Sequence, residues 1–458
     1  MFNKVLVANR GEIAVRILKS LKKLGVTSVA VYSEADVNSV HTKLADESVC
    51  LGPPPAADSY LKVDRILEEA RRLGVDAIHP GYGFLAENAE FAEACEESGI
   101  CFIGPRPGAI RAMGSKISSR QIMSEAGVTT VPGGLESVPN LEDAERAADR
   151  IGYPIAVKAS GAGGGKGFRV AHSPVELSDA FHGAQGEGAR FFNDGTVYLE
   201  KYLSDPRHIE VQVLGDTHGN VIHLFERDCS IQRRHQKLVE ETPAPTIDEN
   251  LRQRITTEAV QAASAINYTS AGTVEGLVAD GEFYFLEMNT RIQVEHGITE
   301  LVTGIDIVEQ QLKIAAGQPL DLRQVDVKSD GHAIEVRINA ENAEKGFLPS
   351  PGSITSYREP SYDGVRVDSG VEEGSSILPF YDSLLAKVLV HADTRENATA
   401  LMIEALESFT LEGPKATLLP FHRALMKSRE WANAETAREL VDNPSKFMKS
   451  DISRPERG

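Results

Sequence analysis

The sequence predicts a multidomain protein that combines an α/β fold with α+β regions, and three observations support this class. The chain has 458 residues, too many for one core and about three domains by length. Its apolar fraction of 41% and charged fraction of 25% are ordinary for a globular protein, which excludes a disordered or fibrous chain. Strand and helix patterns alternate near the N-terminus, whereas later segments mix long strands with fewer helices.

The N-terminal domain, expected over residues 1–113, has the pattern of a doubly wound parallel sheet. An apolar strand at 5–8 precedes apolar residues at helical spacing from Ile13 to Leu24. Further strands are expected at 28–32, 77–79 and 101–103. Strands joined by helices of this length form a parallel sheet with a ligand crevice at the carboxyl ends of its strands. That fold alone does not determine a function.

The rest of the chain is expected to form two more domains. Proline and glycine cluster between Pro105 and Gly114, which indicates a boundary. The expected divisions are a second domain over 114–330, a lid subdomain within it at about 132–203, a C-terminal α+β domain over 331–446, and a tail over 447–458.

The composition excludes several classes of partner. The 48 basic and 67 acidic residues give a net charge of −19, which repels nucleic acids and anionic lipids, so neither is expected as a partner. No run of 18 apolar residues is present, which argues against a membrane span. Residues 1–4 lead directly into a strand and leave no room for a signal peptide. The four cysteines lack CxxC spacing and predict free thiols, so a cytoplasmic protein is expected.

A glycine-rich segment, residues 161–167, is a candidate phosphate-binding loop. Its glycines allow backbone N–H groups to turn toward an anion, and Lys166 adds charge. Gly167 stands where a Walker A loop has serine or threonine, so the segment is not such a loop. Two interpretations stay open, a lid that covers phosphates and a flexible hairpin tip. Likewise, Lys158 in an apolar stretch either points at a phosphate or protects a sheet edge.

Two acidic residues in apolar strands indicate a ligand site more specifically than the glycine-rich segment does. Glu275 and Glu287 lie on either side of the turn 279–281, so a hairpin would place them on adjacent strands. Like charges side by side in a partly buried sheet repel each other unless a cation lies between them. Oxygen ligands suit Mg²⁺, and Asn289 offers another oxygen. The alternative is a pair of acids that face outward.

Polar residues after this hairpin add candidates for catalysis. Arg291 is suited to hold a small oxyanion, and Glu295 to act as a general base beside it. Upstream, residues 226–237 form a second polar cluster, for which a solvated charged face is the alternative interpretation. The order of a lysine, a glycine loop, paired acids and an arginine favours a nucleotide-dependent ligase.

Four segments resemble those of biotin carboxylases, which are ATP-grasp enzymes. They are VANRGEIA at 7–14, HPGYGFL at 79–85, residues 226–237, and EMNTRIQVEH at 287–296. The resemblance covers nearly the whole chain and implies a doubly wound N-terminal domain, an ATP-grasp domain with a mobile glycine-rich lid, and a C-terminal α+β domain. It implies that ATP and bicarbonate form carboxyphosphate, which yields carbon dioxide and phosphate. Carbon dioxide would then reach N1′ of biotin on a carrier protein.

The same resemblance implies the cofactors and partners. ATP and Mg²⁺ (or Mn²⁺) would be bound, and biotin would be a substrate on a biotin carboxyl carrier protein. Met426–Lys427 and Met448–Lys449 lack the hairpin of a biotin acceptor, so the carrier and the carboxyltransferase subunits would be separate chains. A homodimer is expected. The expected role is the biotin carboxylase subunit of acetyl-CoA carboxylase. The alternatives are a propionyl-CoA, pyruvate or urea carboxylase and a catalytically silent nucleotide-binding scaffold.

Matched motif by motif, the resemblance implies three groups of ligand-binding residues and a catalytic group. The ATP-binding residues would be Lys116, Lys158, Gly164, Gly165, Glu200, Lys201, Leu203, His208, Gln232, His235, Glu275 and Glu287. The metal ligands would be Glu275, Glu287 and Asn289, and the bicarbonate ligands would be Lys237, Arg291, Gln293 and Val294. The catalytic residues would be Lys237, Arg291, Glu295 and Arg337. Among these, Glu295 would deprotonate bicarbonate, and Arg337 would bind the ureido oxygen of biotin.

Two glycines depart from the family pattern. Gly276 stands where a bulky aromatic residue is usual, so packing volume beside the metal and the adenine is expected to be lost. Nucleotide affinity is the property that this departure puts in question. Gly297 stands where proline is usual, and together with EETP at 240–243 it is similar to the urea carboxylase branch.

Overall fold

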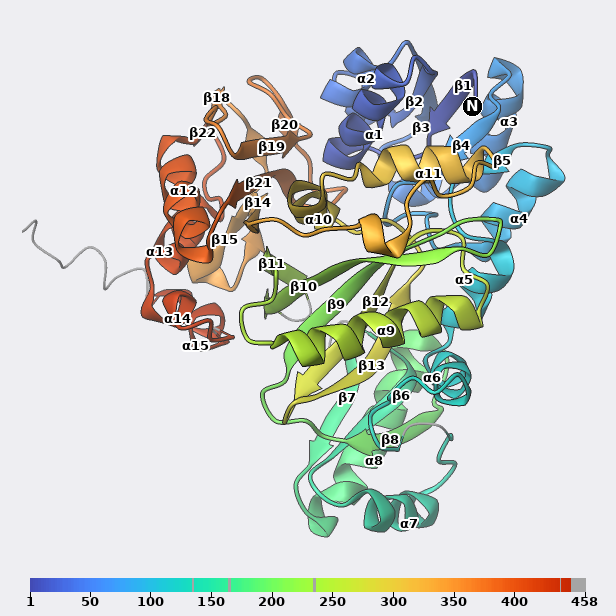
Figure 1. Cartoon of the computed structure of the whole chain (residues 1–458), viewed down its shortest axis with the longest axis vertical. Helices are drawn as coiled ribbons and strands as arrows, with labels where there is room; N and C mark the ends of the chain where they lie inside the picture. The colour runs from blue at the N-terminus through green and yellow to red at the C-terminus, as the bar shows by residue number, and fades with distance from the viewer. Residues whose placement is uncertain (134–135, 164–165, 234–235, 437, 446–458) are drawn as a thin grey trace, which may run out of the picture.

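Three sheets of three or more strands organise the described part of the chain. The computed structural model describes all residues except 134–135, 164–165, 234–235, 437 and 446–458. These sheets have five, eight and three strands. Figure 1 shows the N-terminal sheet and the three-stranded lid sheet at opposite ends of the molecule, with strands of the eight-stranded sheet between them.

The N-terminal sheet is parallel and has the order β3-β2-β1-β4-β5, which confirms the expected doubly wound domain. Its strands are β1 (Lys4–Val7), β2 (Thr27–Ser33), β3 (Glu47–Gly52), β4 (Ala77–His79) and β5 (Cys101–Phe102). Its helices are α1 (Gly11–Lys23), α2 (Val40–Leu44), α3 (Val63–Leu73), α4 (Ala89–Glu97) and α5 (Pro107–Gly114). The carboxyl ends of β1 and β4 lie side by side. Asn9 joins the two loops there, donating from Nδ2 to the carbonyl oxygens of Pro80 and Tyr82, each at 2.7 Å.

Helix α1 illustrates how local sequence produces these elements. Ile13, Ile17 and Leu21 recur at helical spacing and are buried in the domain core. Glu12 lies in the first turn and lysines lie in the last, which complements the helix dipole. The helix therefore forms locally and packs through its apolar side.

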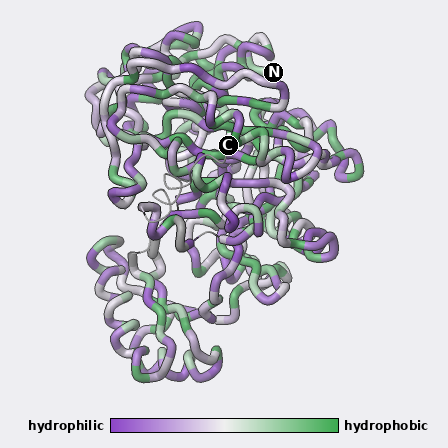
Figure 2. The backbone as a smooth tube through the Cα atoms, turned by 90° about the vertical axis from the view of Figure 1, so that its left-hand side faces the viewer, coloured by the Kyte–Doolittle hydropathy of each residue, from purple (hydrophilic) through white to green (hydrophobic). Residues whose placement is uncertain are grey.

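The lid is a separate layered unit that follows α6 (Lys116–Glu125). Its sheet has the order β7-β6-β8, and its helices cover a core of their own. The elements are α7 (Leu141–Ile151), β6 (Ile155–Gly163), β7 (Lys166–Ala171), α8 (Pro174–Phe192) and β8 (Val197–Lys201). Figure 2, turned by 90°, shows this unit as a lobe at the lower end of the molecule, with hydrophobic and hydrophilic residues interspersed along it.

The eight-stranded sheet is antiparallel throughout and has the order β13-β12-β9-β10-β11-β14-β21-β19. Its strands are β9 (Arg207–Gly215), β10 (Val221–Arg233), β11 (Gln236–Thr242), β12 (Ser270–Ala279), β13 (Glu282–Asn289), β14 (His332–Asn339), β19 (Val365–Ser369) and β21 (Leu384–Ala392). The pairing of β11 with β14 joins strands from either side of residue 330 into one sheet. The division of the chain at residues 113 and 330 stays a prediction.

The C-terminal half of this sheet has one apolar face and one charged face. Val336 and Val388 belong to an apolar core with residues of α12 (Arg395–Ser408) and α13 (Leu419–Met426). Alternate residues on these strands, including Glu335 and Lys387, are charged and equally buried. Helices α1 and α10 (His296–Thr303) pack near these strands. Because side chains alternate along a strand, one strand contributes to both environments.

The remaining described elements are short or cover the sheets. The helices are α9 (Glu249–Ala265), α11 (Ile307–Ala315), α14 (Arg429–Ala432) and α15 (Arg438–Asp442). The strands are β15 (Glu341–Asn342), β16 (Leu348–Pro349), β17 (Gly352–Ser353), β18 (Ser356–Arg358), β20 (Ser376–Ile377) and β22 (Thr410–Glu412). No described helix combines the length and the apolar character that a membrane span requires.

Candidate active site

Glu275 on β12 and Glu287 on β13 are direct partners across the antiparallel pair. Cross-strand partners place their side chains on one face, so the expected hairpin with paired acids is present. Lys116 Nζ lies 3.7 Å from Glu287 Oε2, and Asn289 Nδ2 donates to Glu275 Oε1 at 2.6 Å. The Glu287 side chain is 37% exposed, so its carboxylate is accessible from solvent. These oxygen donors match what a hard divalent cation requires.

Lys237 on β11 lies at the centre of a group of carboxylates. Its Nζ contacts Glu210 and lies 2.8 Å from Glu275 Oε1 and 2.6 Å from Glu295 Oε1. Burial alone lowers the pKa of a lysine, but these three carboxylates raise the pKa of Lys237 well above its usual value. Lys237 therefore stays charged and offers a fixed cation to an anionic ligand.

Glu295 lies between two cations at the end of the loop that precedes α10. Lys237 contacts its Oε1, and Arg337 Nη2 donates to its Oε2 at 2.7 Å. Burial alone raises the pKa of this carboxyl, but the charges of Lys237, Arg337 and Arg227 hold the pKa well below its usual value. Glu295 is therefore ionised at neutral pH, which is the form that a general base needs.

Arg337 on β14 is held by carboxylates on two sides. Its Nε donates to Glu240 Oε1 at 2.7 Å, in addition to the bond with Glu295. The guanidinium is planar, so bonds to two partners fix its orientation as well as its position. An arginine held in this way is suited to stabilise negative charge on a substrate oxygen.

Arg291 links the loop after β13 to the N-terminal domain. Its Nε donates to Glu87 Oε2 at 2.8 Å, its Nη1 to Gln293 Oε1 at 2.8 Å, and its Nη2 to Asn289 Oδ1 at 3.0 Å. Glu87 precedes α4, so this arginine spans two parts of the chain that are far apart in sequence. Arg291 thus lies beside the paired acids and within the polar group around Lys237.

The lid contributes a buried ion-pair network. Glu200 on β8 contacts both Arg120 on α6 and Lys158 on β6. Strand β6 is the middle strand of the lid sheet, so the interpretation of Lys158 as a protector of a sheet edge is wrong. Lys201 Nζ instead donates to the carbonyl oxygens of Gly152 and Tyr153, at 3.0 and 2.9 Å.

The other predicted ligands fall into four groups. His208 Nε2 lies 3.0 Å from Glu275 Oε2, and Gln293 Nε2 donates to Glu275 Oε1 at 2.8 Å. Gln232 and Val294 make backbone contacts, Gln232 Nε2 with the Cys229 carbonyl at 2.8 Å and the Val294 carbonyl with Lys387 Nζ at 2.5 Å. Leu203 is half-buried after β8. Three predicted ligands lie outside the described residues: Gly164, Gly165 and His235.

Sequence reasoning missed two buried residues of this site. Glu210 on β9 accepts from Arg227 Nε at 2.7 Å, and both side chains are fully buried. Glu210 alternates with apolar residues, the pattern of an acid that faces solvent, and nothing in the strand itself shows otherwise. Arg227 belongs to the polar segment 226–237, whose interpretation as a solvated face is wrong because residues 226–229 are buried.

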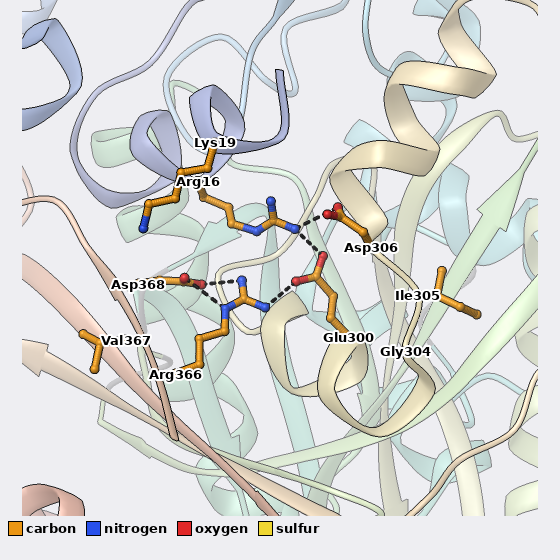
Figure 3. Close-up of a pocket in the computed structure, with 9 residues that line it drawn as sticks. All are labelled: Arg16, Lys19, Glu300, Gly304, Ile305, Asp306, Arg366, Val367 and Asp368. Carbon is orange, nitrogen blue, oxygen red and sulfur yellow. Dashed lines mark hydrogen bonds and ion pairs between the residues drawn. The ribbon is translucent and has the colours of Figure 1, made fainter. Parts of the chain in front are cut away.

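A second charged group lies where α1, α10 and β19 meet, around a cavity of about 410 Å³. Glu300 lies between Arg16 and Arg366 and pairs with each at 2.7 Å, as Figure 3 shows. Asp306 pairs with Arg16 and Asp368 with Arg366. Each arginine is thus paired with carboxylates of the group, and Lys19 on α1 also lines the cavity.

Three family models match the chain over most of its length. The biotin carboxylase N-terminal domain matches residues 1–110, the ATP-binding domain of the carbamoyl-phosphate synthase L chain matches 115–323, and the biotin carboxylase C-terminal domain matches 335–443. The chain is 52% identical to biotin carboxylase 1 of Bacillus subtilis, covering 95% of this chain and 97% of the relative. The chain belongs to the biotin carboxylase family.

Further relatives and solved structures extend this result. A pyruvate carboxylase subunit of Methanothermobacter thermautotrophicus is 52% identical, with 99% of this chain and 92% of the relative covered. The biotin carboxylase domain of 2-oxoglutarate carboxylase from Hydrogenobacter thermophilus, a dimer with MgADP, ADP and bicarbonate, matches with a TM-score of 0.91 at 47% identity over 98% and 99% of the two chains. Biotin carboxylase from Campylobacter jejuni matches with a TM-score of 0.92 at 45% identity over 96% and 99%. As a member of the biotin carboxylase family, the protein is an enzyme.

Gly276, which departs from the usual biotin carboxylase pattern, does not leave a void. A Cβ there would lie 2.1 Å from Phe283 Cε2 and 2.8 Å from the carbonyl oxygen of Tyr284. Phe283 is buried in the core beneath α9. Its ring takes up the space beside residue 276, so the expectation that packing volume is lost there is wrong.

Gly297, the second departure from biotin carboxylases, lies in the first turn of α10. A Cβ at this position would lie 2.4 Å from Leu389 Cδ2, so α10 approaches β21 more closely than a larger residue allows. The close approach places the start of α10 directly over the charged face of the sheet.

Proposed function

We propose that this protein carboxylates biotin on a separate carrier protein, using ATP and bicarbonate, as the biotin carboxylase subunit of acetyl-CoA carboxylase. One observation carries the proposal: Lys237 and Arg337 hold the two oxygens of Glu295. A buried carboxylate kept ionised between two cations is suited to take a proton from an anionic substrate that the same cations attract. The similarity to biotin carboxylase 1 of Bacillus subtilis supports the reaction.

A role in pyruvate carboxylase is the second candidate. The pyruvate carboxylase subunit from Methanothermobacter thermautotrophicus is as similar as the Bacillus subtilis protein and of comparable length. The acceptor would be carboxylated on another chain, so the residues of the present site serve both roles.

Nucleotide and metal would bind along the paired acids and under the lid. Glu275, Glu287 and Asn289 would hold Mg²⁺ or Mn²⁺, because they offer oxygen donors on one face and Glu287 is accessible. When bound, such an ion neutralises charge on the nucleotide phosphates. The ATP contacts would come from Lys116, Lys158, Gly164, Gly165, Glu200, Lys201, Leu203, His208, Gln232, His235, Glu275 and Glu287.

Bicarbonate would bind beside Glu295 and lose its proton there. Lys237 and Arg291 would compensate its charge, with Gln293 and the Val294 segment completing the site. Glu295 takes the proton, and the resulting carbonate oxygen attacks the γ-phosphorus as the bond to ADP breaks, giving carboxyphosphate. Positioning and charge compensation supply most of the catalysis in such phosphoryl transfer.

Biotin would accept carbon dioxide next to Arg337. Carboxyphosphate breaks down to carbon dioxide and phosphate. The phosphate takes the proton from N1′ of biotin, and N1′ then attacks the carbon dioxide. Arg337 stabilises the negative charge that develops on the ureido oxygen. Closure of the lid would exclude water, which protects carboxyphosphate from hydrolysis.

The proposed assembly is a cytoplasmic homodimer that works with other chains. The dimer formed by the Hydrogenobacter thermophilus domain supports a homodimer here. A biotin carboxyl carrier protein would present biotin, and carboxyltransferase subunits would use the carboxylated product. Sedimentation of the purified chain tests the dimer, and the chains that copurify identify the acceptor.

Bicarbonate-dependent ATP hydrolysis tests the proposed reaction directly. With Mg²⁺ present, we expect free biotin to stimulate ATP hydrolysis and to become carboxylated. If neither occurs while nucleotide still binds, the chain is a nucleotide-binding scaffold and the proposal is wrong.

A further inference from the structure

Glu240 on β11 and Glu335 on β14 form a buried carboxyl pair behind Arg337. They are direct partners in the antiparallel register, which places their Cβ atoms about 5 Å apart. Both side chains are fully buried. Two ionised carboxylates in this arrangement would repel each other, and burial makes an uncompensated charge costly.

The carboxyls of Glu240 and Glu335 differ in their hydrogen bonds. Glu240 Oε1 accepts from Arg337 Nε at 2.7 Å, which gives this residue the features of the ionised partner. Glu240 Oε2 and both oxygens of Glu335 have no hydrogen-bond partner among the described residues. A buried carboxylate with neither oxygen bonded is unfavourable, whereas a protonated carboxyl carries no charge and adds a donor.

The cations near Glu335 have other partners. Lys387 Nζ donates to the Val294 carbonyl at 2.5 Å and lies 3.5 Å from Glu12 Oε2, and Arg366 pairs with Asp368 and Glu300. The charged and titratable groups around Glu335 come from each element packed against it: Glu240 on β11, Arg337 on β14, Lys387 on β21, Arg366 on β19, Glu295 and His296 at the start of α10, and Glu12 on α1. Burial raises the pKa of Glu335 well above its usual value and raises the pKa of Glu240 to about 7.

We propose that Glu240 and Glu335 hold one proton between them and that Glu335 is a positioning residue for Arg337. The task of Arg337 rests on the proposed function, but the shared proton does not. With Glu335 neutral, the guanidinium is shared by two carboxylates, Glu240 and Glu295. A charge on Glu335 would compete for the guanidinium and repel the Glu295 carboxylate, which would move Arg337 away from its place beside the base.

Infrared spectroscopy tests the proton directly, because a protonated carboxyl has a carbonyl stretch that a carboxylate lacks. At about pH 8, above the pKa of about 7 for Glu240, we expect the full-length protein to show this band, Glu335→Gln to lose it, and Glu240→Gln to keep it. The matched control is Glu226→Gln, a buried acid paired with Arg252 that should not remove the band. Absence of the band from the unmodified protein overturns the proposal, even if the variants fail to fold.

The pH profile of biotin carboxylation tests the positioning role. Glu335→Gln should keep kcat at pH 7 within about threefold, because the amide reproduces the neutral carboxyl. The fall in its activity on the alkaline side of the pH profile should shift to higher pH by at least about one unit, because the variant cannot ionise at position 335. A role limited to packing would lower stability and leave this fall in activity at the same pH, which would overturn the positioning claim. If no variant carboxylates biotin but the infrared band behaves as expected, the proposed function fails and the shared proton stands.

Discussion

Arg337 donates through Nη2 to Oε2 of Glu295 at 2.7 Å, so the base and the cation proposed to face biotin belong to one charge network. Lys237 binds the other oxygen of the same carboxylate at 2.6 Å. Proton transfer to Glu295 therefore changes the charge that both cations experience. The network connects the two halves of the proposed reaction through a single buried side chain.

Glu295→Gln should separate catalysis from nucleotide binding. We expect turnover to fall about 100- to 10,000-fold, because the amide cannot accept the bicarbonate proton. The affinity for ADP, measured by calorimetry, should change by no more than about threefold, since Glu295 contacts Lys237 and Arg337 and not the paired acids. A variant that keeps most of its rate would show that another group is the base.

Glu287→Lys should remove the metal site. Placing a cation opposite Glu275 should lower the affinity for Mg²⁺–ATP at least about tenfold, since it replaces an oxygen donor with a positive charge. Removing Mg²⁺ with a chelator should weaken nucleotide binding in the wild type and have little further effect in the variant. The control is Glu282→Lys, at the exposed start of the same strand, which should bind normally. Equal affinities for both variants would contradict the assigned ligands.

Arg337→Gln should affect the biotin step more than the ATP step. Biotin carboxylation should fall about 100- to 1,000-fold, the usual effect of losing one group that stabilises an oxyanion. Bicarbonate-dependent ATP hydrolysis without biotin should fall by less than about tenfold, because Lys237 still holds Glu295. Both reactions are assayed on one preparation of the variant. Equal losses in biotin carboxylation and in ATP hydrolysis would show that Arg337 acts in the ATP step.

Gly276→Ala should destabilise the fold. Its Cβ would overlap the buried ring of Phe283, and we expect a loss of about 1–3 kcal/mol in the free energy of unfolding. Gly186→Ala is the control, because that glycine lies on the exposed side of α8 with open space at its Cβ and should gain up to about 1 kcal/mol. Thermal unfolding of both variants checks that Gly276→Ala is less stable than the wild type and that Gly186→Ala is not. A neutral Gly276→Ala would show that Phe283 moves readily.

The stability of Glu335→Gln relative to the wild type should rise with pH. A carboxyl whose folded pKa is raised contributes its full stability below the unfolded pKa of about 4.3 and loses it as pH rises through the folded pKa. The glutamine has no such dependence. Between pH 5 and 8 the free energy of unfolding of Glu335→Gln, taken relative to that of the wild type, should grow by up to about 1.4 kcal/mol per pH unit. Denaturant unfolding midpoints measured at several pH values check this. A constant difference would mean that Glu335 is already ionised.

Local sequence determined much of the fold and one part of the site. The alternation of strands and helices predicts the doubly wound domain, because strands separated by helices pair in parallel and the helices connect them across the sheet. Glu275 and Glu287 are separated by a short turn, and a tight hairpin brings such neighbours together without help from the rest of the chain.

Only the tertiary structure decided how the charges meet. Lys237, Glu295 and Arg337 come from β11, a loop and β14, and they converge because β11 pairs with β14 while α10 packs over the sheet. A strand's period of two distinguishes its faces but does not reveal which face another element will cover. Glu210 and Glu335 therefore have the sequence pattern of solvent-facing acids, yet both are fully buried. Sheet order and helix packing, which depend on contacts between distant segments, turned those acids into parts of a buried charge network.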